Sequence, residues 1–143
     1  MAVVRGVFRA AAVRGTDRGV IMGIELNHTI VGARDKHASA RFLADVLGVE
    51  VGAETGPFVP VVLDNSATLD YMTQSDVRPQ HYAFLVDEAR FDEAFGRIRD
   101  AGIAYWADPG HQTPGEINHR WGGRGVYFDD PDGHNMELLT KAP

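Results

Sequence analysis

The pattern of apolar and polar positions predicts two helices among several short strands. Residues 35–47 and 88–101 carry apolar side chains at the three- and four-residue spacing of an amphipathic helix. Gly48 and Gly102 follow these stretches, as is typical of a helix C-terminus. Short segments rich in β-branched or aromatic residues predict strands at residues 26–31, 49–51, 58–63, 67–72, 81–86 and 103–106.

The predicted elements form an internal repeat. A strand, a helix and further strands occur twice, about 53 residues apart, and each copy opens on a strand with a central histidine. His28 precedes Gly48 by 20 residues, and His81 precedes Gly102 by 21. The chain is therefore expected to be α+β and to contain two similar units.

A tight hairpin is predicted near the end of the chain. Asp130, Pro131 and Gly133 have the residue types of a type I turn followed by a glycine bulge, which gives a three-residue loop. This register places Tyr127 opposite Glu137, with both side chains on one face of the hairpin. Because Glu137 lies between apolar neighbours, its charge needs compensation, and a cation is the obvious candidate.

The repeat supplies further ligands for such a cation. His28 and His81 lie at equivalent places in the two units, and with Glu137 they make a set of two imidazoles and one carboxylate. That set suits Fe(II), which is favoured here, and also Mn(II) or Zn(II). The open positions of such an ion would let a substrate bind through two neighbouring oxygens.

Composition narrows the possible partners. The chain has 143 residues, 44% of them hydrophobic and 24% charged, as expected for a single globular domain. Its net charge of −6 and the lack of a basic run disfavour nucleic acid and anionic membranes as partners. Without cysteine, any metal must be held by histidine and carboxylates, and a cytoplasmic location fits.

Residues 23–140 resemble the vicinal-oxygen-chelate superfamily, which includes glyoxalase I, extradiol dioxygenases, fosfomycin-resistance enzymes and bleomycin-binding proteins. The resemblance depends on Asn27-His28, on Gln80-His81-Tyr82 and on the segment from Asp130 to Glu137. It implies paired βαβββ modules whose curved sheets enclose a metal-binding cavity, with modules at about residues 24–75 and 79–141. It also implies His28, His81 and Glu137 as metal ligands, a small-molecule substrate and a homodimer that can build its sites across the interface.

The spacing of Ile117, His119, Tyr127, Asp130 and Glu137 is similar to the pattern around the extradiol dioxygenase site. That likeness implies catalytic roles for His119, which would hydrogen-bond oxygen or substrate, and for Tyr127, which would hold a substrate hydroxyl. Dioxygenase-like chemistry on a catechol or enediol is therefore the first hypothesis. The extra acid–base histidine usual in extradiol enzymes has no counterpart between Ser66 and Gln80.

Two alternatives stay open. In a glyoxalase- or isomerase-type enzyme no O₂ is needed, and Asp70 would be a fourth ligand. In a binding protein of the bleomycin-resistance kind, a metal-free cavity would sequester an aromatic molecule, and the three candidate ligands would have no role. Sequence alone identifies neither the substrate nor the metal, nor whether His28 meets His81 within one chain.

Residues 1–22 are predicted to be an N-terminal extension ahead of a domain at residues 23–143. Three other histidines, His37, His111 and His134, are expected to be solvated because they lie on a helix, in a loop and at a turn.

Overall fold

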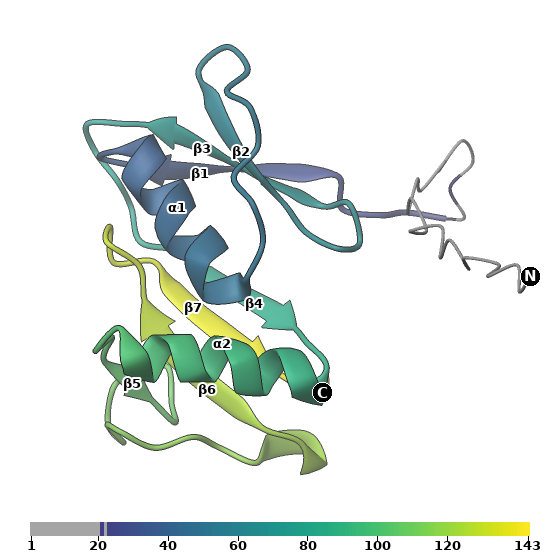
Figure 1. The fold of residues 1–143 in the computed structure, drawn as a ribbon, viewed down its shortest axis with the longest axis vertical. Helices are drawn as coiled ribbons and strands as arrows, with labels where there is room; N and C mark the ends of the chain where they lie inside the picture. Colours follow the sequence, from purple (N-terminus) through teal and green to yellow (C-terminus); the bar gives the residue numbers. More distant parts are fainter. Residues whose placement is uncertain (1–20, 22) are drawn as a thin grey trace, which may run out of the picture.

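The computed structural model describes residue 21 and residues 23–143, so the predicted extension lies almost wholly outside the described residues. Two modules follow one another along the chain (Figure 1). The first contains β1 (His28–Ala33), α1 (Lys36–Leu47), β2 (Phe58–Val62) and β3 (Thr68–Thr73). The second contains β4 (His81–Leu85), α2 (Glu88–Asp100), β5 (Tyr105–Trp106), a 3-10 helix (Arg120–Gly122), β6 (Gly125–Asp129) and β7 (Asn135–Leu139).

The two modules share one topology. The first sheet has the strand order β1-β3-β2 and the second has the order β4-β7-β6-β5. In both, the opening strand pairs in parallel with the last strand of its module. The predicted strand at residues 49–51 is reduced to a single bridge between Val51 and Val61, which occupies the place of β5. The predicted α+β fold of paired βαβββ modules is confirmed.

Local capping explains where the helices begin and end. The Asp35 carboxylate accepts hydrogen bonds from the backbone N–H groups of His37 and Ala38. Gly48 ends α1 in the left-handed conformation, at φ 72°, which glycine adopts without a Cβ clash. The Asp87 carboxylate caps α2 by accepting a hydrogen bond from the backbone N–H of Arg90.

The helices pack against each other and against one face of each sheet (Figure 1). Alternate strand residues are buried on that face, while the residues between them are more exposed. We call the opposite surface of each sheet its helix-free face. His28 and Asp70 lie on the helix-free face of the first sheet, and His81, Tyr127 and Glu137 lie on that of the second.

The turn between β6 and β7 connects the second module to the first. Asp132 accepts hydrogen bonds from the Arg34 backbone N–H at 2.9 Å and from the Ser39 hydroxyl at 2.6 Å. His134 Nδ1 accepts from the Gln80 N–H at 2.9 Å, and its Nε2 donates to the Gly32 carbonyl at 2.7 Å. These bonds fix the relative placement of the modules.

The expectation that His134 is solvated was wrong, because its side chain is buried between the modules. No helix in the described part of the chain is long and apolar enough to cross a bilayer.

Candidate metal centre on the second sheet

The parallel pairing of β4 with β7 brings His81 and Glu137 together. His81 lies opposite Asn135, and Ala83 lies opposite Glu137, so both candidate ligands point from the same face. The distance from His81 Nε2 to Glu137 Oε2 is 3.1 Å. These two predicted ligands therefore meet, although they are 56 residues apart in the sequence.

Hydrogen bonding fixes which nitrogen of His81 carries the proton. Nδ1 lies 3.0 Å from the Asn135 carbonyl oxygen and 3.1 Å from the Asn135 side-chain oxygen. Both partners are acceptors, so Nδ1 must be the donor. In the neutral ring, the lone pair of Nε2 then faces the carboxylate of Glu137. Two lone pairs at this distance repel unless a proton or a cation lies between them.

A divalent cation fits this donor pair. Nitrogen and oxygen ligands lie about 2.0–2.2 Å from such ions, so two donors at a right angle are about 3 Å apart. The observed 3.1 Å matches that separation. An N–H donor on the far side of a ligand imidazole, as Nδ1 is here, is also the usual arrangement around protein-bound metals.

Tyr127 borders the pair, as the hairpin register predicts. It lies opposite Glu137 in the β6–β7 ladder, and its ring stacks on His81 with centroids 6.0 Å apart. Burial is the main cause that raises the pKa of its hydroxyl, and the Glu137 carboxylate raises it further, while Arg120 opposes them. Tyr127 is therefore protonated at neutral pH and can donate a hydrogen bond.

Sequence reasoning missed Arg120, whose guanidinium Nη1 donates to the Tyr127 hydroxyl at 3.3 Å. The residue beside it, His119, is exposed, and its imidazole has no hydrogen-bond partner within the described ranges. His119 precedes a short 3-10 helix that begins at Arg120 and in which Trp121 has φ 60°. The backbone of this turn is irregular, so no periodic pattern in the sequence could have predicted the contact between Arg120 and Tyr127.

His28 lies apart from the His81–Glu137 pair. It is exposed on the first sheet, and its Nδ1 is 2.7 Å from the Asn27 side-chain oxygen. Among the residues that the structure describes, one chain gathers no group of three histidine or carboxylate side chains that could hold an ion. Asp70 shares the face of His28, two register positions further along the sheet.

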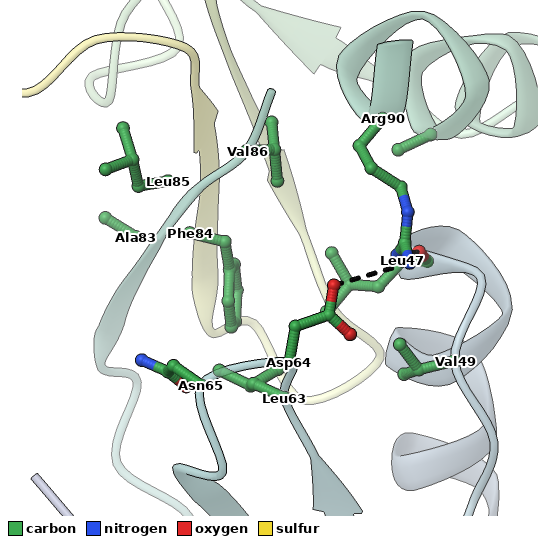
Figure 2. A pocket seen from close by; sticks show the side chains of 11 residues that line it. Leu47, Val49, Leu63, Asp64, Asn65, Ala83, Phe84, Leu85, Val86 and Arg90 are labelled. Carbon is green, nitrogen blue, oxygen red and sulfur yellow. Dashed lines mark hydrogen bonds and ion pairs between the residues drawn. The ribbon is translucent and has the colours of Figure 1, made fainter. Parts of the chain in front are cut away.

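A cavity lies elsewhere, at the junction of the modules (Figure 2). It has a volume of about 480 Å³, and its wall includes Leu47, Leu63 and Phe84. An ion pair of 3.4 Å joins Arg90 to Asp64 at this cavity. Neither His81 nor Glu137 lines it, so the candidate centre is a surface feature of the second sheet in a single chain.

Known proteins resemble this chain in sequence and in structure. Residues 25–138 match the model of the family described as the Glyoxalase/Bleomycin resistance protein/Dioxygenase superfamily. The solved structure of the oxidase ChaP-H2 is 61% identical, covers 85% of this chain and 96% of its own, and has a TM-score of 0.82. The glutathione transferase FosA of Serratia marcescens is 31% identical over 120 residues, covering 79% of this chain and 78% of that protein.

Among more distant structures, the fosfomycin resistance protein FosX of Listeria monocytogenes has a TM-score of 0.64 at 21% identity. It covers 85% of this chain and 95% of its own. At that identity the likeness concerns the fold alone.

Proposed function

Because the chain belongs to the glyoxalase/bleomycin resistance/dioxygenase superfamily, we propose that it is a metal-dependent oxidative enzyme. Its substrate is a small molecule that presents two adjacent oxygens, with a catechol or similar enediol as the first candidate and dioxygenase-like chemistry as the first reaction type. The observation that carries the proposal is the 3.1 Å contact between His81 Nε2 and Glu137 Oε2. The 61% identity with a protein named an oxidase supports the oxidative class.

The third ligand in this proposal is His28 from a second copy of the chain. His28 and His81 open equivalent strands of the two modules, and His28 has an exposed ring whose Nδ1 already has a partner. A first sheet from one copy, placed against a second sheet from another, would bring the His28 Nε2 toward the His81–Glu137 pair. The enzyme would then be a homodimer with two equivalent sites.

Apolar side chains on the helix-free faces support such an interface. Ile30 is 47% exposed, Val62 48% and Leu85 64%. These residues lie on the same faces as the candidate ligands, where a second copy would cover them. Burial of such a surface is the usual driving force for association.

The ligand set of two imidazoles and one carboxylate favours Fe(II), with Mn(II) or Zn(II) as alternatives. When bound, the ion would act as a Lewis acid and as the anchor for two neighbouring substrate oxygens. Asn135 would keep the His81 Nε2 available by holding the proton on Nδ1.

The remaining groups act on the substrate directly in this proposal. Tyr127 would donate its hydroxyl hydrogen to a substrate oxygen, and the positive charge of Arg120 would favour the substrate in its ionised form. His119 is the candidate proton carrier at the rim, since it is exposed and directly precedes Arg120, which contacts Tyr127.

Oxygen consumption tests the proposal. Protein stripped of metal is loaded anaerobically with Fe(II), Mn(II) or Zn(II) and then supplied with a panel of catechols and O₂. We expect oxygen uptake with at least one redox-active metal, and its loss in Glu137→Gln. Full metal occupancy without uptake on any catechol or enediol would contradict the oxidative assignment.

A second candidate is transfer or isomerisation without O₂. The relative from Serratia marcescens is named a transferase, and Asp70 lies on the face that would carry His28 to the site. Asp70 would then be the fourth ligand of a glyoxalase-type centre. Turnover under anaerobic Zn(II) or Ni(II) that is lost in Asp70→Asn would favour this reading over the first.

A further inference from the structure

The hydrogen bonds around His81 continue beyond Asn135. The Asn135 side-chain oxygen accepts from His81 Nδ1, and its Nδ2 donates to Asp129 Oδ1 at 3.3 Å. The same Asp129 oxygen lies 3.3 Å from His111 Nε2. A second histidine is thus connected to the candidate metal ligand through an amide and a carboxylate.

His111, the last residue in this series of contacts, is held in a defined position. The His111 ring stacks on Trp106 with centroids 3.7 Å apart and an interplanar angle of 7°. Its backbone has φ 59°, a left-handed conformation that side chains other than glycine adopt at some cost. Trp106 lies opposite Tyr127 in the β5–β6 ladder, so this stack borders the same face as the site.

We propose that Asn135, Asp129 and His111 are positioning residues for His81. They form a relay that keeps the proton of His81 on Nδ1 and its lone pair on Nε2, and the Trp106 stack anchors the relay. This inference rests on the proposed metal centre.

The polarity of each contact fits the relay. Asp129 can only accept when ionised, so it orients the Asn135 amide with its nitrogen toward Asp129 and its oxygen toward His81. That orientation rules out the reversed amide, which would present a donor to the His81 donor. His111 Nε2 lies 3.3 Å from the same Asp129 oxygen and so places a second polar group beside this carboxylate. Outer partners of this kind raise ligand basicity and typically change metal affinity by about 10–100-fold.

The effect of the relay on His81 can be measured as a change in Zn(II) affinity, without any substrate. Zn(II) binding to wild type, Asp129→Asn, His111→Phe and the double variant is followed by competition with a chromogenic chelator. Phenylalanine keeps the stacking surface on Trp106 but removes the ring nitrogen that contacts Asp129. We expect Asp129→Asn to weaken Zn(II) binding by about 10-fold and His111→Phe by a smaller factor. Because His111 acts through Asp129, His111→Phe should have no further effect in the Asp129→Asn background.

A matched control exists on the first module. His37 Nε2 lies 3.4 Å from Glu54, in an exposed pair with no link to His81. His37→Phe and Glu54→Gln should leave Zn(II) affinity unchanged. Thermal unfolding of each variant confirms that it is folded, and Asp129→Glu tests whether a restored carboxylate recovers affinity.

The outcomes separate the relay from the metal centre. If wild type binds no Zn(II), the proposed metal centre itself is wrong. If wild type binds Zn(II) and the folded relay variants bind it equally well, or if the effects of His111→Phe and Asp129→Asn simply add, the relay is wrong. In the zinc-loaded protein, ring ¹⁵N spectra should also show the His81 Nδ1–H resonance shifting in Asp129→Asn but not in Glu54→Gln.

Discussion

The hydroxyl of Tyr127 lies between a cation and a carboxylate. Arg120 donates to it, and the nearby Glu137 carboxylate helps to raise its pKa. The stacking of its ring on His81 does not depend on the hydroxyl. The two parts of this side chain can therefore be tested separately.

Tyr127→Phe should leave folding and metal affinity nearly unchanged, because the ring contact with His81 remains. Turnover should fall by about 100-fold, since a hydrogen bond to the reacting substrate is lost. Steady-state kinetics at saturating substrate check this result, with Tyr105→Phe as the control on the same sheet. Unaltered turnover in Tyr127→Phe would remove the hydroxyl from the proposed mechanism.

Tyr71 is fully buried in the first module, and burial is the main cause that raises its pKa, followed by the charge of Asp130. In the unfolded chain the phenol titrates near its ordinary value of about 10. The folded state keeps the proton to higher pH, so the stability that this phenol contributes is present below about pH 10 and is lost as pH rises above it.

Urea unfolding between pH 8 and pH 11 measures that dependence. The free energy of unfolding should decrease above about pH 10. In Tyr71→Phe this free energy should fall less steeply with pH, and the difference in slope should correspond to at most about one bound proton. Equal slopes in the two proteins would show that Tyr71 does not contribute. Tyr82 and Tyr127, whose pKa values burial also raises, contribute to the slope that remains in Tyr71→Phe.

At the scale of elements, the β6–β7 hairpin follows from local residue types. Gly133 has φ 82°, the Gly133 N–H bonds the Asp130 carbonyl, and Tyr127 pairs with Glu137. Each of these features depends on residues within a few positions of the turn, so the sequence predicts them. The same holds for the two helices, whose caps Asp35 and Asp87 are adjacent to them.

Long-range contacts of the same turn could not be predicted in this way. His134 follows a turn glycine and would be solvated in an isolated hairpin. It is buried because Gly32 and Gln80, 102 and 54 residues away, provide its hydrogen-bond partners. Arg120 is a similar case, since an irregular turn brings it to Tyr127.

The turn also provides a test of how the modules are held together. Asp132→Ala removes the acceptor for the buried Ser39 hydroxyl and for the Arg34 N–H. Because these two donors lose their hydrogen bonds, the free energy of unfolding should fall by about 3 kcal/mol. Urea denaturation measures the change against Asp76→Ala, an exposed carboxylate for which we expect less than about 0.5 kcal/mol. Equal stability of the two variants would mean that Asp132 does not hold the modules together.

At the scale of the whole molecule, the repeat identifies His28 and His81 as equivalent positions but does not place them together. Within one chain the helices of the two modules face each other (Figure 1), and the candidate ligands lie on the helix-free faces. The His81–Glu137 half of the site is formed by pairing within one sheet. In the proposed homodimer its completion by His28 would be a property of the assembly, which no pattern within a single chain determines.

Mixing two inactive variants tests this assembly. His28→Ala and Glu137→Ala should each lose activity, because every site in either homodimer lacks one ligand. A mixed dimer has one site in which His28 comes from the Glu137→Ala chain and the intact His81–Glu137 pair from the other chain. Random pairing gives about half mixed dimers with one intact site of two, so co-refolded protein should recover about a quarter of wild-type activity.

His81→Ala mixed with Glu137→Ala is the matched control, because both changes affect the same half of the site and no dimer contains an intact pair. Recovery in the first mixture but not in the second requires that each site combines the first module of one chain with the second module of another. If neither mixture recovers while wild type is active, His28 meets His81 within one chain or is no ligand. Metal content of the His28→Ala protein then distinguishes these two cases, since only a true ligand lowers it.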